Sequence, residues 1–374
     1  MSWPIPEIPK LPKISKPKYK VWFYSFVFLS CIAYFFLTLF GEKTGYTNIF
    51  LYLILPVLLI WISVFGVTIH RYEYYLASQK AWEKESAYTT HLWQEWSKWQ
   101  QAVLGNVFLS PEEEGASVML GDIKNIPMYP KKCRPLFGER KGFAEYLLTV
   151  HLELEQQLPE YRNHLFQIYL LCSDKLYLKN IIDDIFNQWL LVPDVLDLNS
   201  ASELVQEDAE YKGGVLLLCV NCWPHHADQE HSEFITAQLI SSVEYAREYQ
   251  LPVLAALGRA MPLDNMALSN DLEMLFKYNE IEKTELQHVW LVGESQKSFE
   301  GLVMFAEEAE WLLPEKNPAY RVNLSFGPSH ELLFFNSLAL VTDAVIHTQQ
   351  DQLLISQDSA STNFLCLIKK DFFK

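Results

Sequence analysis

The residues best suited to chemistry gather at the end of one apolar run, at 214–222. The run closes on a C-x-x-C pair, Cys219 and Cys222. Thiolates and imidazoles at close spacing can bind zinc, and paired thiols can serve redox exchange. However, the run is typical of a strand, which points residues three apart to opposite faces of a sheet. The sequence therefore favours a strand end here, with no metal and no cofactor.

The loop after this run is a candidate binding site. In open α/β sheets, ligands bind beyond the carboxyl ends of the strands. A ligand or partner site is one interpretation of this loop, and a solvated loop is the other. The candidate binding residues in it are Trp223, His225, His226 and Asp228.

Motifs for familiar catalytic chemistry are absent from the sequence. It contains no G-x-x-x-x-G-K-[ST] phosphate loop, no G-x-G-x-x-G after a strand and no G-x-S-x-G nucleophile elbow. Its six cysteines lack the spacing of a disulfide framework. On these grounds we predict no catalytic residue, and a protein that is not an enzyme.

The elements that would hold these residues alternate between helix and strand from about residue 141. Short, bounded apolar runs predict strands at 164–172, 214–222, 252–257 and 287–292. The remaining runs predict helices at 143–157, 180–191, 233–249, 299–312 and 331–347, and a closing strand pair at 351–356 and 363–369. This order indicates an α/β fold with a mostly parallel sheet and helices on both faces.

Two long apolar segments precede this domain, at 21–40 and 49–69, and neither holds a charged side chain. As helices, each is about 30 Å long, which matches the hydrocarbon core of a bilayer. They predict a two-helix transmembrane hairpin. Residues 1–20, with five lysines, one acid and five prolines, predict a basic, extended arm. The positive-inside rule then places the N-terminus and the C-terminal domain in the cytoplasm.

The charges are divided unevenly along the chain. The whole sequence carries 30 basic and 46 acidic residues, a formal charge of −16. The arm has a net charge of +4 and the loop 41–48 holds one charge of each sign, so residues 70–374 hold 24 basic and 44 acidic groups, net −20. A domain this acidic repels phosphate, which argues against nucleic acid as a partner and favours a basic protein partner.

A juxtamembrane helix is predicted over 70–104, followed by a cytoplasmic α/β domain over 105–374. Three tryptophans, Trp93, Trp96 and Trp99, would lie along one side of this helix. Indole rings carry large apolar surfaces that need cover. Packing within the chain is the default expectation, and a protein partner or the surface of the lipid bilayer are the alternatives.

The end of the chain carries a resemblance. The run Phe326-Gly327-Pro328-Ser329-His330 leads into the helix at 331–347 and the closing strand pair. This unit resembles the closing unit of thiolase-like folds, and the loop at 326–330 is similar to the Gly/His loop before that helix in condensing enzymes. The resemblance covers about the last 55 residues and adds His330 as a candidate binding residue. It implies a catalytically inactive copy, because none of the cysteines begins a helix in the first half.

The overall layout resembles accessory proteins of bacterial type VI secretion clusters. The resemblance is carried by the two spans, by the stretches 69–72, 92–96 and 102–105, and by a domain without catalytic motifs. It implies a non-enzymatic adaptor or accessory factor of the bacterial inner membrane, with a secreted effector or secretion component as protein partner. One alternative is an immunity protein against a membrane-targeted toxin. The other is a divergent membrane-bound acyltransferase or hydrolase that uses His225, His226, Asp228 and His330.

Overall fold

The computed structural model describes residues 3–6, 8–9, 11–40, 50–173, 177–206, 212–223, 231–263, 268–293, 296–328, 330–357 and 363–373. The chain divides into two compact units. One unit is residues 6–92 and holds the two apolar segments. The other joins residues 1–5 to residues 93–374 and holds the α/β domain.

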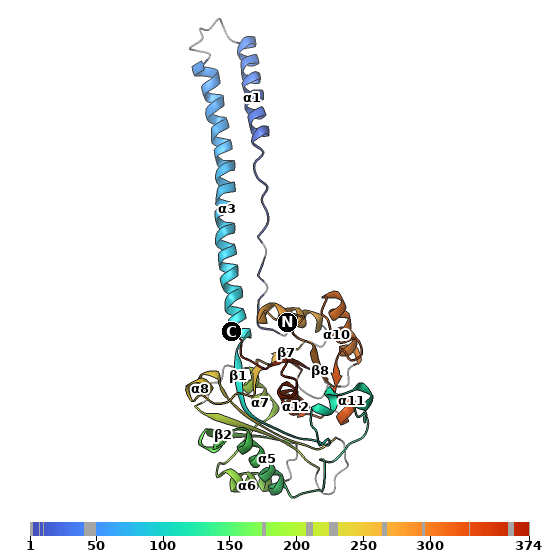
Figure 1. Cartoon of the computed structure of the whole chain (residues 1–374). Helices are drawn as coiled ribbons and strands as arrows, with labels where there is room; N and C mark the ends of the chain where they lie inside the picture. The colour runs from blue at the N-terminus through green and yellow to red at the C-terminus, as the bar shows by residue number, and fades with distance from the viewer. Residues whose placement is uncertain are drawn as a thin grey trace. The chain divides into compact units, whose positions relative to one another are not determined.

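The apolar segments form helices that pack on each other (Figure 1). They are α1 (Tyr19–Phe40), the short π-helical η1 (Phe50–Ile54) and α3 (Leu55–Ser97). Trp61 on α3 contacts α1, and its Nε1 donates to the carbonyl oxygen of Trp22 at 3.1 Å. By length and composition both helices could span a membrane.

Helix α3 ends earlier than the sequence predicts. Its last residue is Ser97, and a strand, β1 (Gln100–Leu109), begins three residues later. The predicted juxtamembrane helix over 70–104 is therefore wrong at its end, and the predicted domain start at 105 falls inside β1. The physical reason is that β1 is a central strand of the sheet, and its ladder bonds on both sides outweigh the helical spacing of the tryptophans.

Eleven strands form one mixed sheet in the order β3-β2-β4-β5-β1-β6-β11-β10-β8-β9, with β7 beside β11. The strands after β1 are β2 (Leu165–Cys172), β3 (Asp194–Val195), β4 (Gly214–Asn221), β5 (Phe234–Ser242), β6 (Ala255–Gly258), β7 (Met261–Pro262), β8 (His288–Val292), β9 (Tyr320–Arg321), β10 (Gln352–Ser356) and β11 (Phe364–Lys369).

The sheet is built from two halves with the same strand order. Read from the outer edge, the first half is β3-β2-β4-β5-β1 and the second is β9-β8-β10-β11-β6. In each half the outer strands are parallel, and the fourth strand in the order is antiparallel to its neighbours. The halves meet where β1 pairs with β6, and there Gly258 has no room for a Cβ, which would lie 2.7 Å from the carbonyl oxygen of Leu367.

The predicted α/β class is confirmed, with a sheet that is mixed where the sequence indicated a mostly parallel one. The difference comes from β5. The sequence predicts a helix over 233–249, but Phe234–Ser242 is a strand that returns directly from β4, and only Val243–Glu248 (α8) is helical. Both faces of β5 are buried, and its polar residues Thr236 and Gln238 contact α12. These residues therefore do not mark a solvent-facing side from which a strand could be recognised.

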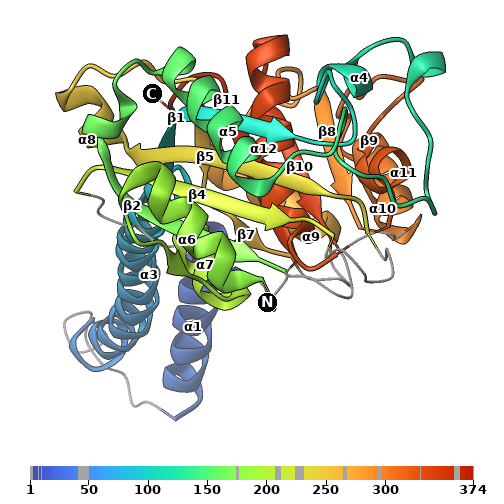
Figure 2. The same ribbon diagram turned by 90° about the horizontal axis from the view of Figure 1, so that it is seen from below.

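Helices cover both faces of the sheet (Figure 2). A central core, shared by both halves, holds α7 (Leu198–Gln206) and the long buried α12 (Leu333–Thr348). The outer face of the first half is covered by α5 (Phe143–Gln157), α6 (Leu178–Trp189) and α8. The outer face of the second half is covered by α9 (Leu268–Asn279) and α10 (Gln296–Glu308). The short helices are α4 (Ser117–Leu120), η2 (Ile123–Asn125), η3 (Tyr161–Asn163) and α11 (Val322–Phe326).

Candidate functional site

His330 stands on a sharp turn just before the central helix α12. Helix α11 ends at Phe326, and Gly327 follows with φ +94° and ψ −165°, a conformation essentially restricted to glycine. A Cβ at Gly327 would lie 2.7 Å from the carbonyl oxygen of Lys132. The hydroxyl of Ser232 donates to the carbonyl oxygen of Phe326 at 2.5 Å. These contacts fix the turn that carries His330.

The imidazole of His330 lies in a buried amide network. Its Nδ1 accepts a hydrogen bond from the backbone N–H of Leu332 at 3.2 Å. Its Nε2 faces the amide groups of Asn221 at 3.0 Å and Asn336 at 3.4 Å. Asn221 lies at the end of β4 and Asn336 on α12, so strand and helix together position the ring. The hydroxyl of Thr236 on β5 contacts the amide oxygen of Asn336 at 3.2 Å.

Burial keeps His330 neutral. Only 7% of the residue is exposed, and burial, helped by the nearby charge of His231, lowers the pKa of His330 to about 3. The N–H of Leu332 faces Nδ1, and the amide nitrogen of Asn221, which donates to the carbonyl oxygen of Ser232 at 3.1 Å, faces Nε2. A neutral imidazole carries its proton on one of these two nitrogens. The site therefore presents a neutral imidazole.

Three of the described cysteines, Cys219, Cys222 and Cys366, offer no thiolate nucleophile. Helix α7, the central helix of the first half, begins at Leu198 and contains no cysteine. Its start is capped by Asp197, whose carboxylate accepts the N–H of Ser200 at 2.8 Å. Burial raises the pKa of Cys219 to about 12 and raises the pKa of Cys222 and Cys366 further. These thiols stay protonated at neutral pH.

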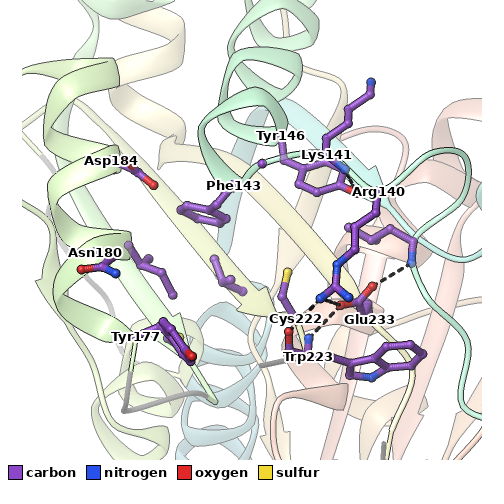
Figure 3. A pocket seen from close by; sticks show the side chains of 15 residues that line it. Arg140, Lys141, Phe143, Tyr146, Tyr177, Asn180, Asp184, Cys222, Trp223 and Glu233 are labelled. Carbon is purple, nitrogen blue, oxygen red and sulfur yellow. Dashed lines mark hydrogen bonds and ion pairs between the residues drawn. The ribbon is translucent and has the colours of Figure 1, made fainter. Parts of the chain in front are cut away.

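Trp223 does not lie in the His330 network. It lines a cavity of about 680 Å³ on the outer face of the first half (Figure 3). Its backbone N–H donates to the carboxylate of Glu233 at 2.7 Å, and its Nε1 donates to the carbonyl oxygen of His231 at 2.5 Å. Three other candidates from the same loop, His225, His226 and Asp228, lie outside the described residues.

The three tryptophans at the end of α3 have contacts within the domain. The guanidinium of Arg259 lies 4.3 Å from the ring centroid of Trp96 and 4.9 Å from that of Trp99. The rings of Trp93 and Trp96 meet edge to face at 5.5 Å and pack on the outer core of the second half. The structure does not bring them together with His330, and a partner-binding role for them stays a prediction.

Sequence reasoning named His330 as a candidate and missed the two amides that lie beside it. Asn221 and Asn336 are fully buried, yet they are separated by more than a hundred residues in the chain. Each does leave a weak signal, because each is a lone amide inside an otherwise apolar run. Buried polar side chains need partners, so such amides point to a polar network.

Comparison with known proteins shows the fold. No protein-family model matches the sequence, and no curated protein matches it. A chain from a type II polyketide synthase acyl-carrier protein in complex with its ketosynthase aligns over 73% of this chain and 100% of its own, with TM-score 0.50 and 10% identity. An oxazolomycin ketosynthase domain from Streptomyces albus aligns over 73% and 96%, with TM-score 0.47 and 12% identity. The 3-oxoacyl-[acyl-carrier-protein] synthase III of Aquifex aeolicus aligns over 72% and 99%, with TM-score 0.43 and 9% identity.

At these identities the likeness concerns the fold alone, and it confirms the expected thiolase-like domain. The prediction of a non-enzymatic type VI secretion adaptor is contradicted, because the proteins that share the fold are ketosynthases. Nothing in these comparisons points to type VI secretion. The wrong prediction arose because two apolar segments and an acidic composition bear on where a protein is located and carry no information about the chemistry of its site.

Proposed function

We propose that this chain is a membrane-anchored enzyme that acts on acyl thioesters and transfers the acyl group to a hydroxyl or to water. The single observation that carries the proposal is the buried, neutral imidazole of His330, held before the central helix of a ketosynthase-like fold. The acyl donor would be a thioester on an acyl-carrier protein, since a structural neighbour is a ketosynthase in complex with one.

The chemistry requires the tautomer with the proton on Nε2, in which Nδ1 accepts the Leu332 N–H. A thioester carbonyl gains negative charge on its oxygen when a hydroxyl or water attacks its carbon. The Nε2–H of His330 would donate to that oxygen, in place of the amide of Asn336. The carbon–sulfur bond would then break, and the proton of the attacking hydroxyl or water would pass to the leaving thiolate, which departs as the carrier thiol. A preorganised donor at a developing oxyanion contributes about 10²–10³ in rate. An acyl-cysteine step is not part of this route, because helix α7 contains no cysteine.

The anchoring is the second part of the proposal. Helices α1 and α3 would cross the membrane as a hairpin, with both chain ends on the cytoplasmic side of a bacterial inner membrane. Support comes from Trp3 and Ile5, which are buried in the outer core of the second half. A residue before the first span can join the domain after the second span only if both lie on one side. The basic arm places that side in the cytoplasm by the positive-inside rule.

The activity test uses the full chain in detergent. Release of free thiol from acyl-carrier-protein and coenzyme A thioesters is followed with a thiol-reactive dye. We expect His330→Ala to lower turnover by about 10²–10³. His330→Gln, whose amide can donate but cannot take up a proton, should retain more activity than His330→Ala. The control is His347→Gln, a half-exposed histidine on α12, the helix that His330 precedes.

Two results would contradict the proposal. One is the absence of thioester turnover by the wild-type chain with every acyl donor. The other is equal turnover by His330→Ala and wild type. Topology is tested separately with single cysteines at the exposed positions Lys16 and Glu145 and a membrane-impermeant maleimide on oriented vesicles. We expect both cysteines to be labelled from the same side, and labelling from opposite sides would refute the hairpin.

A further inference from the structure

The outer cavity of the first half lies between α5 and α6, where β2 and β4 end (Figure 3). Its volume of about 680 Å³ is within the range of about 300–1,000 Å³ that small-molecule sites occupy. Its floor is apolar and is formed by Leu136, Phe143, Cys172, Ile181 and Val220. A ligand with an apolar body would therefore replace water over most of this floor.

Two cations lie at the rim of the cavity: the guanidinium of Arg140 turns toward Cys222 and Trp223, and the ammonium of Lys141 turns away from the cavity (Figure 3). Arg140 and Lys141 precede α5, and both side chains are exposed at the rim. Arg140 donates through Nη2 to the carbonyl oxygen of Trp223 at 3.1 Å. Among the described residues, the Nζ of Lys141 has no hydrogen-bonding partner.

The carboxylate beside these cations is already engaged. Glu233 is 4% exposed and accepts the N–H of Trp223 at 2.7 Å and the N–H of Leu136 at 3.1 Å. Its oxygen lies 3.9 Å from Nη2 of Arg140, a loose ion pair. Glu233 thus holds the two loops of the rim in place and leaves most of the Arg140 donors open to a second anion.

We propose that this cavity binds an organic carboxylate with an apolar body. The carboxylate would lie against the guanidinium of Arg140, and the exposed side chain of Lys141 would turn toward it. The apolar body would cover the floor. The opposite wall, on α6, carries Asp184, whose carboxyl group would repel an anion there. The two walls therefore orient the ligand. This goes beyond the proposed function, because the cavity is separate from His330.

The separation follows from the strand that divides the two places. On β4, Val220 belongs to the outer core and lines the cavity, while the neighbouring Asn221 turns to the opposite face and contacts His330. Alternation along the strand sends successive side chains to opposite faces. A ligand in the cavity and a substrate at His330 would thus lie on opposite sides of the same strand end.

The experiment uses a matched pair of cysteines on α6 of the full chain in detergent. Asn180→Cys is exposed at the rim of the cavity, and Lys179→Cys is exposed one residue away, outside the lining. Maleimide labelling of each is followed by peptide mass spectrometry with octanoate or its neutral analogue octanamide. We expect octanoate to slow labelling at position 180 and to leave position 179 unchanged.

Charge is tested in the Asn180→Cys background. With Arg140→Gln or Lys141→Gln, about tenfold more octanoate should be needed for the same protection, as for the loss of one charge-assisted hydrogen bond. Arg140→Gln also removes the hydrogen bond to the carbonyl oxygen of Trp223. Lys141→Gln removes a charge without removing that bond, so it tests the role of charge separately. Three results would overturn the proposal: octanoate gives no protection, octanoate slows both positions equally, or octanamide protects as well as octanoate.

Discussion

Acidification should destabilise this domain through His330 in a way that a single substitution removes. The perturbation is a change from pH 7.5 to pH 5. In the folded domain the pKa of His330 is lowered to about 3 by burial, and in the unfolded chain an imidazole titrates near 6.5. Between these values the unfolded state binds the proton and the folded state does not. Stability is therefore complete above the unfolded pKa and falls as the pH drops below it.

The magnitude follows from the two pKa values. At pH 5 the unfolded histidine is almost fully protonated and the folded one is neutral, so folding must release one proton. The cost relative to pH 7.5 is about 2 kcal/mol, because each pH unit below the unfolded pKa contributes about 1.4 kcal/mol. For a unit of about 290 residues, that corresponds to a fall in Tm of about 3 °C.

The assay is thermal unfolding of the full chain in detergent at both pH values, for wild type and His330→Gln. Glutamine retains an amide donor and does not titrate. All other titrating groups are common to both chains, so the difference between the two pH-induced falls in Tm isolates His330. We expect the fall to be about 3 °C larger for wild type. An equal fall in both chains would show that His330 is protonated in the folded state or is not buried, and would refute the argument that the imidazole is neutral.

Further predictions concern the packing around this site. Gly327→Ala should cost about 1–3 kcal/mol, because φ is positive and the new Cβ would meet the carbonyl oxygen of Lys132; Gly301→Ala, in a helix with space for the methyl group, should gain about 0.5–1 kcal/mol, and denaturant unfolding compares the two. Trp3→Ala should lower stability by about 2 kcal/mol through lost burial, whereas Leu11→Ala at an exposed position should change it by less than about 0.5 kcal/mol. Equal effects within either pair would contradict the reasoning.

Much of the domain could be predicted from local sequence, and the reasons are visible in particular elements. The closing unit was predictable because the long apolar helix at 333–348 and the strands β10 and β11 are each bounded by turn-forming residues. The same closing unit supplied the thiolase-like resemblance and His330. The strands β2, β4 and β8 were likewise short, bounded apolar runs.

What could not be predicted depends on contacts between distant segments. The sequence of β5 does not by itself distinguish a strand from a helix, and its pairing with β4 and β1 decides the matter. The burial of Trp3 and Ile5 could not be predicted, because the arm around them is rich in proline and lysine. Such a composition is typical of an extended segment in solvent. The amide network of His330 joins β4 to α12, and no local pattern encodes such a pairing.

The end of β4 links the two proposed sites physically. Its inward side chain, Asn221, contacts His330 and donates to the carbonyl oxygen of Ser232 at 3.1 Å. The residue after Ser232 is Glu233, whose carboxylate holds the loops at the rim of the outer cavity. A ligand that drew Arg140 away from Glu233 would therefore disturb the neighbour of Ser232, whose carbonyl oxygen holds Asn221 beside His330.

If the two sites are coupled in this way, octanoate should change the turnover of wild type. At the same concentration it should leave the turnover of the Lys141→Gln chain unaltered. Unchanged wild-type turnover under full occupancy of the cavity would show that the two faces of this strand end act independently.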